Sequence, residues 1–362
     1  MVGSEVIKMI EELNEHYDVV VIGGGAAGLN GALMLARARR SVAVIDAGSP
    51  RNAPAEGVHG LLGREGMPPG ELLERGRGEV RGYGGQVVPG EVDVVARDGD
   101  DFDVTLVDGR RTRARRLLVT SGVVDELPDI AGLREHWGID VVHCPYCHGW
   151  EIRDQAIGVL ALGPLAVHQA LMFRQWSDDV VFLTHTAPPP TVEDVERLAA
   201  RGIPVVNGEV VGLEVDDGRL SGVRLRDGRV IARSAVAAAP RTTVRGAFLD
   251  GLGLRPVEHP AGVGNFIPSD AGGGSDVPGV WVAGNITEPM SQVGASAAAG
   301  AMAGAQINAD LINEEVRLAV EAARDPFSAK AARDPFTADA ESIVSGRAAS
   351  ARRTVSERPQ RE

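Results

Sequence analysis

The order of elements near the N-terminus limits the folds that are open to this chain. Residues 17–22 are apolar and largely β-branched, as in a buried strand of a parallel sheet, and the pattern of residues 29–38 is helical. Between them lies a turn with the spacing G-x-G-x-x-G, formed by Gly23, Gly25 and Gly28. In this setting the glycines allow a tight turn, close approach of the backbone to a pyrophosphate, and close packing of the helix on the strand.

A second apolar strand, at residues 41–46, ends on Asp46, whose carboxylate is suited to a ribose hydroxyl. A glycine motif alone is a weak signal, but a strand, glycines, a helix, a second strand and an acid in register are a strong one. The alternative, a glycine turn that holds no nucleotide, leaves this order unexplained. The pattern therefore predicts an α/β fold with a dinucleotide site.

The two cysteines of the chain lie in one motif, Cys144-Pro145-Tyr146-Cys147-His148. Two residues between the sulfurs allow a disulfide within one tight turn, and a helix that starts there would lower the pKa of a thiol. A zinc site needs four ligands, but there is no second cysteine pair, and His143 and His148 leave too little chain to surround the ion. We therefore expect a redox-active thiol–disulfide centre and no metal, ahead of the alternative of two buried, apolar thiols.

Length and charge narrow the function further. A chain of 362 residues predicts two domains, and a net charge of −13 without a basic cluster argues against nucleic acid or an anionic membrane as a partner. No apolar run is long enough to span a bilayer. The first residues lack the basic start and apolar stretch of a signal peptide, so we expect a cytoplasmic protein, in which a CxxC pair serves catalysis.

Several of these motifs together resemble the low-molecular-weight thioredoxin reductase family of flavoproteins, over residues 15–315. The matching landmarks are Gly23-Gly24-Gly25-Ala26-Ala27-Gly28, Thr120-Ser121-Gly122, Cys144-x-x-Cys147, Ala283-Gly284-Asn285, Gln292-Val293 and Gly300. The resemblance implies a thioredoxin reductase-like α/β fold with two Rossmann-like dinucleotide-binding domains. In this arrangement the FAD domain is split by an inserted domain that carries the CxxC and an NAD(P)H-like site.

The order of motifs then divides the chain into domains. Residues 1–16 are an N-terminal extension, residues 17–125 and 245–315 form the discontinuous FAD-binding domain, and residues 126–244 form the central CxxC-bearing domain. The Arg/Ser/Glu-rich tail at residues 316–362 has the composition of a mostly disordered segment.

Shorter patterns predict further elements. Residues 86–88 and 102–107 are expected to be hairpin-like strands, with a turn at Asp108-Gly109 after the second. Residues 157–163 begin a second strand–turn–helix unit, and residues 279–285 include another strand. A helix rich in small residues is expected from Gly294 to about Ile312.

The resemblance also implies which residues bind FAD. They are Gly23, Gly25, Ala26, Ala27, Gly28, Asp46, Arg51, Asn52, Ser121, Gly122, Gly284, Asn285, Gln292 and Val293. Arg51 and Asn52 are placed to reach the pyrophosphate or the flavin edge. Asn285 stands where the family has an aspartate that binds the ribityl chain, and an amide can still hydrogen-bond a hydroxyl. Gln292 and Val293 precede a helix whose N-terminus faces the flavin in the family.

The chain departs from the family at the NAD(P)H site. The second glycine run would fall at residues 161–166, where Leu162 places a bulky side chain and Pro164 removes an amide donor. The basic pair that holds the 2′-phosphate of NADPH is replaced by Thr186-Ala187, so the guanidinium contacts are lost. These changes predict a central domain that no longer binds a nicotinamide. Sequence drift around a working NADH site is the alternative.

A second departure is His148, where thioredoxin reductases have an aspartate. Cys-x-x-Cys-His in this fold resembles the gliotoxin-type and holomycin-type dithiol oxidases, in which electrons pass from a small dithiol through FAD to oxygen. By resemblance, Cys144 exchanges with substrate and Cys147 faces the flavin. An imidazole beside the thiols can accept a proton near neutral pH. The alternative for His148 is a helix residue that faces solvent.

These observations predict an enzyme, an FAD-dependent thiol–disulfide oxidoreductase that by resemblance is a homodimer. Its leading function is oxidation of a small-molecule dithiol by the Cys144–Cys147 pair, assisted by His148, with electrons passing through FAD to molecular oxygen. One alternative is a thioredoxin reductase-like enzyme that acts on a thioredoxin-like protein and takes electrons from NAD(P)H or another donor such as ferredoxin. The other is a flavin-bound redox sensor without turnover.

Overall fold

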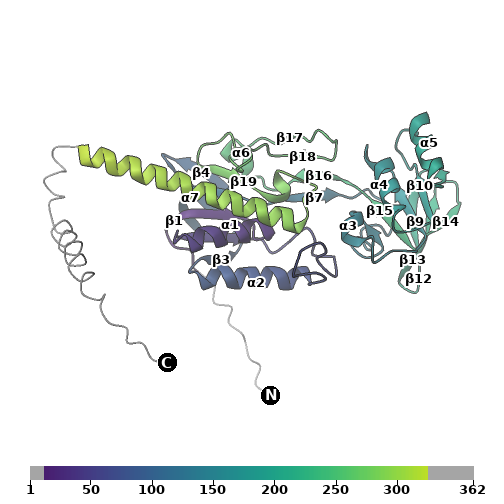
Figure 1. Cartoon of the computed structure of the whole chain (residues 1–362), viewed down its shortest axis with the longest axis horizontal. Helices are drawn as coiled ribbons and strands as arrows, with labels where there is room; N and C mark the ends of the chain where they lie inside the picture. Colours follow the sequence, from purple (N-terminus) through teal and green to yellow (C-terminus); the bar gives the residue numbers. More distant parts are fainter. Residues whose placement is uncertain (1–11, 325–362) are drawn as a thin grey trace, which may run out of the picture. The chain divides into compact units, whose positions relative to one another are not determined.

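The computed structural model describes residues 12–324 of the chain. These residues fall into two units that divide after Asn308, and every element below except the end of the last helix belongs to the first unit. The first unit contains two sheets with parallel strands, and helices pack against both (Figure 1).

The first sheet has the strand order β3-β2-β1-β6-β5-β4, and β19 also pairs with β6. Its strands are β1 (His16–Ile22), β2 (Val42–Asp46), β3 (Gln86–Pro89), β4 (Val92–Asp98), β5 (Asp101–Leu106), β6 (Arg111–Val119) and β19 (Val280–Val282). One edge of β6 pairs in parallel with β1, whereas the other edge pairs first antiparallel with β5 and then parallel with β19. A strand late in the sequence is thereby placed beside the end of β6.

Three helices and a short turn of helix pack around this sheet. Helix α1 (Ala26–Arg37) contacts β1, β2 and β6, helix α2 (Pro69–Gly82) contacts β3 and α1, and α6 (Leu249–Leu252) contacts β4. The 3-10 helix η1 (Gly284–Ile286) follows β19. Apolar side chains of the strands and of α6 form the core here, with Tyr17 and Phe102 among the largest that are fully buried.

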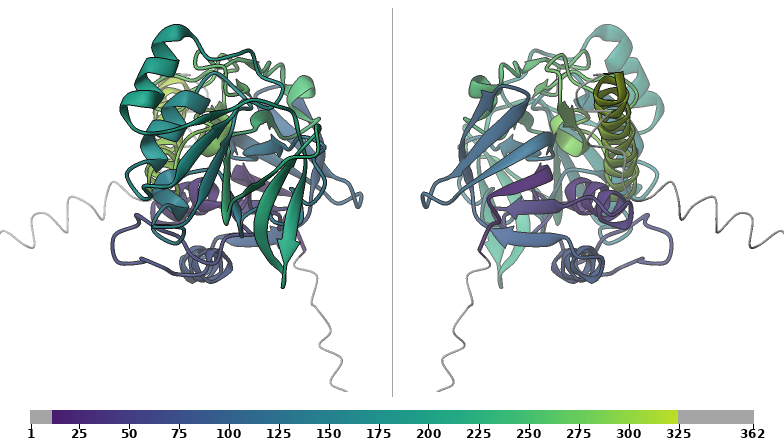
Figure 2. Two further views of the ribbon diagram at one scale, coloured as in Figure 1. Left: turned by 90° about the vertical axis from the view of Figure 1, so that its right-hand side faces the viewer. Right: turned by 90° about the vertical axis from the view of Figure 1, so that its left-hand side faces the viewer.

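Helix α7 (Val293–Arg324) lies beside α1, as Figures 1 and 2 both show. The contact is between backbones: a Cβ at Gly300 would overlap the carbonyl group of Ala27, and a Cβ at Gly304 would lie 2.7 Å from the carbonyl oxygen of Gly31. Glycine is therefore needed where the two helices meet. The contact joins the N-terminal half of α1 to the part of α7 around residues 300–304.

The second sheet is entirely parallel, with the order β11-β10-β9-β15-β8. Its strands are β8 (Val141–Val142), β9 (Ile157–Leu160), β10 (Val180–Leu183), β11 (Val205–Val206) and β15 (Ala235–Ala238). Helix α4 (Ala166–Phe173) packs on β9 and β10, and α5 (Val192–Ala200) packs on α4. A second apolar cluster joins the sheet to an antiparallel sheet of β12 (Val210–Asp216), β13 (Arg219–Leu225) and β14 (Val230–Ala232).

Two antiparallel strands carry the chain between the sheets. β7 (Val123–Glu126) follows β6 on the way to the second sheet, and β16 (Arg241–Val244) follows β15 on the way back. A small hairpin of β17 (Val257–Glu258) and β18 (Asn265–Phe266) comes next. The short helix α3 (Pro145–His148), which begins directly after Cys144 and contains Cys147, lies between β8 and β9 in the sequence.

The expected fold class, with two Rossmann-like cores, is confirmed, and two local expectations are wrong. The turn at Asp108-Gly109 does join two antiparallel strands, but residues 86–88 pair in parallel with β2 and are no part of a hairpin. Helix α7 continues past Ile312 to Arg324, so residues 316–324 are helical although the tail was expected to lack structure. Residues 325–362 lie outside the described residues, and the domain boundaries stay a prediction.

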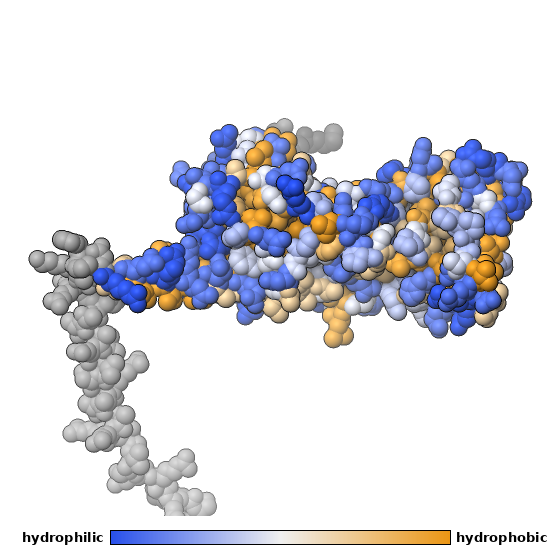
Figure 3. All heavy atoms as spheres, turned by 90° about the horizontal axis from the view of Figure 1, so that it is seen from above, coloured by the Kyte–Doolittle hydropathy of each residue, from blue (hydrophilic) through white to orange (hydrophobic). Residues whose placement is uncertain are grey.

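The surface is largely hydrophilic, as expected when most of the apolar side chains are buried in the core. On the face drawn in Figure 3, hydrophilic residues cover much of the surface, with smaller hydrophobic areas between them. Among residues 12–324 we find no helix that is apolar enough over a sufficient length to cross a membrane.

Substitution of Gly300 by alanine should destabilise the protein, because the new methyl group would overlap the Ala27 carbonyl. We expect a loss of about 1–3 kcal/mol in the free energy of unfolding, as for an overpacked core, measured by thermal or denaturant unfolding. Gly78→Ala is the matched control: Gly78 lies in α2 with open space around it, so alanine should stabilise the helix by about 0.5–1 kcal/mol. Equal stability of Gly300→Ala and wild type would contradict the close helix contact.

Candidate functional site

A cavity of about 490 Å³ extends from the glycine turn after β1 to the two cysteines. All of the residues expected to bind FAD or to react line this cavity, except Gly28. A Cβ at Gly28 would lie 2.6 Å from Thr120 Oγ1 and would overlap the carbonyl group of Gly23. Gly28 therefore allows α1 to pack closely on the end of the sheet, and it does not contact the cavity.

The glycine turn leaves the space that a pyrophosphate needs. Gly23 has a φ of 107°, which favours glycine, and a Cβ at Gly25 would meet no protein atom within 4 Å. Helix α1 starts directly afterwards, and Ala26 and Ala27 line the cavity. The first amides of a helix have no acceptor within it, and the helix dipole is positive at this end. The residues present therefore fit a dinucleotide phosphate.

Asp46, at the end of β2, lies in the same cavity and is held on two sides. Its Oδ1 accepts a hydrogen bond from the backbone amide of Gly48 at 3.0 Å, and its Oδ2 lies 2.9 Å from Arg77 Nη2 of α2. These contacts fix the carboxylate, and each oxygen has a second lone pair that can accept from a ribose hydroxyl.

Arg51 lines the cavity, and its guanidinium group is held by other segments of the chain. Its Nε and Nη2 donate to the two carboxylate oxygens of Asp125 at 3.0 and 2.6 Å, and its Nη1 donates to the carbonyl oxygen of Pro289 at 2.7 Å. Asp125 belongs to β7, so the guanidinium joins three separate segments around the cavity. Asn52, the next residue, lines the cavity as expected.

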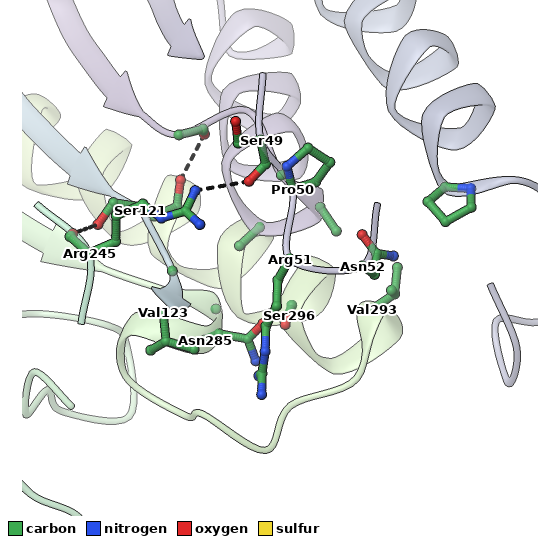
Figure 4. Close-up of a pocket in the computed structure, with 18 of the residues that line it drawn as sticks. Ser49, Pro50, Arg51, Asn52, Ser121, Val123, Arg245, Asn285, Val293 and Ser296 are labelled. Atoms are coloured by element: carbon green, nitrogen blue, oxygen red, sulfur yellow. Dashed lines mark hydrogen bonds between the residues drawn. The ribbon is translucent and has the colours of Figure 1, made fainter. Parts of the chain in front are cut away.

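The end of β6 is tied to the strand that returns from the second sheet. Ser121 Oγ donates to the carbonyl oxygen of Arg245 at 2.6 Å, and Arg245 Nη1 donates to the carbonyl oxygen of Ser49 at 2.9 Å (Figure 4). Gly122 has a φ of 72° in the turn that follows. Ser121 thus helps to shape the wall of the cavity, besides lining it.

The side-chain amide of Asn285 forms hydrogen bonds with its own loop. Its Nδ2 lies 3.2, 3.2 and 3.0 Å from the backbone carbonyl oxygens of three residues that share its two hydrogens, namely Glu288, Pro289 and Ser291. An aspartate could not donate these bonds, which accounts physically for the asparagine at this position. The Oδ1 atom remains as an acceptor for a ribityl hydroxyl.

The disulfide between Cys144 and Cys147 closes one turn of chain, with the two Cα atoms 5.2 Å apart. Cys144 is the N-cap of α3, and its carbonyl oxygen accepts from the amides of Cys147 and His148 at 3.2 and 3.1 Å. Gln292, which precedes α7, reaches both sulfurs: its Nε2 lies 3.8 Å from Cys144 Sγ and 3.7 Å from Cys147 Sγ. The side chain of Gln292 thus contacts the disulfide, a contact that the sequence did not reveal.

His148 lies at the end of α3 and lines the cavity. Its Nδ1 is buried and has no hydrogen-bond partner among the described residues. Burial lowers the pKa of His148 below its usual value; the Glu151 carboxylate opposes this shift, and His59 adds to it. The imidazole is therefore neutral at pH 7 and able to accept a proton. Its position argues against a side chain that merely faces solvent.

His143 is less suited to proton transfer. Burial, and next the positive charge of Arg51, lower the pKa of His143 to about 4, although Asp125 opposes the shift. The backbone carbonyl of His143 accepts a hydrogen bond from Gln169 Nε2 at 2.7 Å. The residue stays neutral over the physiological range of pH.

Another group near the cysteines was missed by sequence reasoning. His59 lines the cavity, its Nδ1 lies 2.6 Å from Glu65 Oε1, and its Nε2 lies 3.6 Å from Glu151 Oε1. Glu151 follows the Cys-x-x-Cys-His motif closely, so its charge was visible in the sequence, but its partner comes from a loop far away in the chain. Asp125 and Arg77 were missed for the same reason.

Substitution of Gly25 by aspartate should abolish FAD binding without unfolding the protein. Aspartate suits the N-cap of α1, and the structure has room for its Cβ, but its carboxylate would occupy the phosphate position and repel it. The expected result is colourless protein with an unchanged far-UV circular dichroism spectrum and no uptake of added FAD. Gly70→Ala in α2, where a Cβ also meets open space, is the control and should stay yellow. A Gly25→Asp protein that is still yellow would show that the phosphate does not bind at this turn.

Comparison with known proteins agrees with the geometry. The pyridine nucleotide-disulphide oxidoreductase family matches residues 17–305. The thioredoxin reductase tcpT of Claviceps purpurea (strain 20.1) is 30% identical over 309 residues, which cover 81% of this chain and 95% of the relative. The thioredoxin reductase sirT of Leptosphaeria maculans is 29% identical over 309 residues, 81% of this chain and 93% of the relative.

Solved structures give the same result. The crystal structure of HlmI has 47% sequence identity and a TM-score of 0.81, and the match covers 86% of this chain and 98% of that chain. An oxidoreductase from Agrobacterium tumefaciens has 36% identity and a TM-score of 0.77, with 82% and 99% covered. The chain belongs to the pyridine nucleotide-disulphide oxidoreductase family, and within it is a thioredoxin reductase-like, FAD-binding oxidoreductase.

Proposed function

We propose that the protein oxidises a small dithiol to a disulfide, with Cys144 and Cys147 as the immediate electron acceptor and molecular oxygen as the final one. The observation that carries this proposal is the shortage of phosphate-binding groups in the turn between β9 and α4, where an NAD(P)H phosphate would have to bind. If no nicotinamide binds, the dithiol is the electron donor that we propose, because the disulfide that would accept its electrons lies in the same cavity.

The turn between β9 and α4 offers few donors to a phosphate. Pro164 has no amide hydrogen, and the amide of Ala166 already donates to the carbonyl oxygen of Gly163 at 3.2 Å. Leu162 packs against the apolar cluster of the second sheet. In a working site the backbone amides of such a turn would point at the pyrophosphate.

A loop from elsewhere in the chain also lies against Pro164 in this turn. The loop between β17 and β18 approaches so closely that a Cβ at Gly262 would lie 3.0 Å from Pro164 Cγ. After β10, the residues that would hold a 2′-phosphate are Thr186 and Ala187, which carry no charge. The nearby loop, the missing amide donors and the missing cations all act against the binding of a nicotinamide dinucleotide.

The residues beside the disulfide suit dithiol oxidation. His148, neutral at pH 7, takes the proton of a substrate thiol, and the resulting thiolate attacks Cys144 Sγ. The Cys144–Cys147 bond breaks, a bond between the substrate sulfur and Cys144 forms, and the electron pair of the broken bond remains on Cys147 Sγ. The second substrate thiolate then attacks the substrate sulfur of the mixed disulfide, which closes the product ring and releases Cys144 as a thiolate.

Bound FAD supplies the two-electron chemistry that reoxidises the cysteine pair and reduces oxygen. In sum, one dithiol and one dioxygen give one disulfide and one hydrogen peroxide, with two electrons and two protons transferred. The residues of the cavity bind and orient the dinucleotide, and His148 handles the thiol protons.

A second candidate is a thioredoxin reductase-like disulfide reductase. The strand–turn–helix of β9 and α4 is retained, and the curated relatives named above are called thioredoxin reductases. In that case electrons would flow from NAD(P)H or another donor to a thioredoxin-like protein. The missing phosphate contacts make this the weaker candidate.

The other assignments that rest on resemblance belong to the same proposal. They are the FAD-binding residues themselves, the division into residues 17–125 with 245–315 and 126–244, and a homodimer. Determination of the holoenzyme structure and of its mass in solution would test them. The cytoplasmic setting, which rests on the N-terminal sequence and on the catalytic CxxC, belongs to the proposal as well, and cell fractionation would test it.

The direction of electron flow can be tested by anaerobic mixing in a stopped-flow spectrometer. Dithiothreitol should bleach the flavin absorbance, and air should restore it with release of hydrogen peroxide. NADPH or NADH should bleach it slowly or not at all. Bleaching by NADPH within roughly 0.1 s, the turnover time of a median enzyme, would refute the oxidase and favour the reductase.

His148→Gln should slow the step in which a dithiol reduces the enzyme, since glutamine keeps polarity but cannot accept the proton. General-base catalysis contributes about 10²–10⁴-fold, so we expect a loss in that range near neutral pH. Because burial lowers the pKa of His148, the wild-type rate should rise with pH through a value below that of an ordinary histidine, and the variant should lack this inflection. His168→Gln, at an exposed site on α4, is the control and should behave as wild type. If the pH profile of His148→Gln is the same as that of wild type, His148 is not the general base.

A further inference from the structure

Gln292 holds a position that none of the other described side chains shares. Its amide nitrogen contacts both sulfurs of the disulfide, at 3.8 Å from Cys144 and 3.7 Å from Cys147. Neither a disulfide sulfur nor a thiolate carries a proton, so the amide can interact with them only as a donor. Because the two sulfurs are bonded to each other and lie in nearly the same direction from the amide nitrogen, a single N–H can point at both.

The segment that carries Gln292 is held in place by hydrogen bonds to its backbone carbonyl groups. The carbonyl oxygen of Gln292 accepts from the amide of Ser296 at 2.9 Å in the first turn of α7. The preceding residues, 288–291, are held by the amide of Asn285 described above, and Pro289 also accepts from Arg51. The side chain therefore approaches the sulfurs from a rigid support, as a group that must act at a defined distance requires.

We propose that Gln292 is a catalytic residue that stabilises the thiolates formed from Cys144 and Cys147 by N–H···S hydrogen bonds. The inference rests on the proposed function only for the direction of electron flow, because opening of the disulfide produces a thiolate in either direction. It assigns the side chain of Gln292 to the sulfurs, beyond the place at the flavin that the family resemblance implies.

The two contacts match the two steps of exchange. When a substrate thiolate attacks Cys144, the S–S bond breaks and negative charge develops on Cys147 Sγ, the leaving group. When the second substrate sulfur closes the product disulfide, the bond to Cys144 breaks and charge develops on Cys144 Sγ. One amide placed equally near both sulfurs can donate to the leaving group in each step, and donation to a charged acceptor is stronger than donation to a neutral one.

In the resting enzyme the charged groups near the sulfurs are paired or neutral, so the Gln292 amide is the donor present from the start, and His148 becomes a cation only after it has taken the substrate proton. Arg51, the cation of the cavity wall next to His143, is paired with Asp125. Burial lowers the pKa values of both His143 and His148, so these groups are uncharged at pH 7. His59 faces two carboxylates, those of Glu65 and Glu151. The N-terminal end of α7 adds a partial positive charge on the same side as Gln292.

The test is the pKa of each cysteine thiol in the dithionite-reduced holoenzyme, measured from the pH dependence of iodoacetamide alkylation and read for each cysteine by mass spectrometry. Gln292→Met keeps the length of the side chain and removes the donor. We expect the pKa of at least one thiol to rise by about one unit and the step with dithiothreitol to slow by about tenfold, as for loss of one charge-assisted hydrogen bond. Gln175→Met, at an exposed position, is the matched control and should change neither value.

Gln292→Glu provides a second variant of the same size, in which the donor is replaced by a negative charge. The thiol pKa values should then rise in the order wild type, Gln292→Met, Gln292→Glu. Unchanged thiol pKa values in both variants, with FAD content and melting temperature retained, would overturn the proposal. A raised pKa in an enzyme that NADPH reduces rapidly would support the role of Gln292 and refute the oxidase, so the two conclusions fail separately.

Discussion

The contact between the backbones of α1 and α7 is the constraint on which the site depends. Gly300 and Ala27 meet without any side chain between them, so the N-terminal parts of both helices can lie close together. The beginning of α1 lines the end of the cavity that fits a phosphate, and Gln292, directly before α7, contacts the disulfide. Parts of the chain that are far apart in sequence thereby contribute to one cavity. A larger residue at position 300 would separate the two halves of the site.

Before the reaction starts, the ionisable groups next to the disulfide are either uncharged or paired with an opposite charge. This distinguishes the site from one that activates a thiol with a nearby cation. Arg51 is neutralised by Asp125, and His143 and His148 are kept uncharged by burial. Negative charge on sulfur is then met by the dipoles of the Gln292 amide and of the α7 N-terminus, together with His148 once this residue has taken the substrate proton. Fixed dipoles need no reorganisation when the charge appears, and they stabilise either cysteine without favouring one.

Local patterns made much of the fold and of the site predictable. The strand, glycine turn and helix at residues 17–37 and the CxxC turn depend on neighbours in sequence, so their structure could be predicted from the sequence alone. The pairing of residues 86–88 with β2 depends on which strand edge is free, and that is not a local property. The continuation of α7 to Arg324 could have been read from its helix-forming alanines and charged residues. The fork between Arg51 and Asp125, the three carbonyls bound by Asn285 and the contact of Gln292 with sulfur all join distant segments, so no spacing in the sequence encodes them.

The loop that lies against Pro164 has a consequence for how such an enzyme can be altered. If this chain binds no nicotinamide, as proposed above, two separate segments act against such binding: the turn after β9 and the loop between β17 and β18. Restoring the glycines and the amide at residues 161–166 would still leave Gly262 against the turn. Shortening the loop would expose a turn in which Pro164 still lacks an amide hydrogen. Because each change would be without benefit until the other is present, single substitutions would not create a nicotinamide site, and engineering for NADPH would have to replace both segments at once.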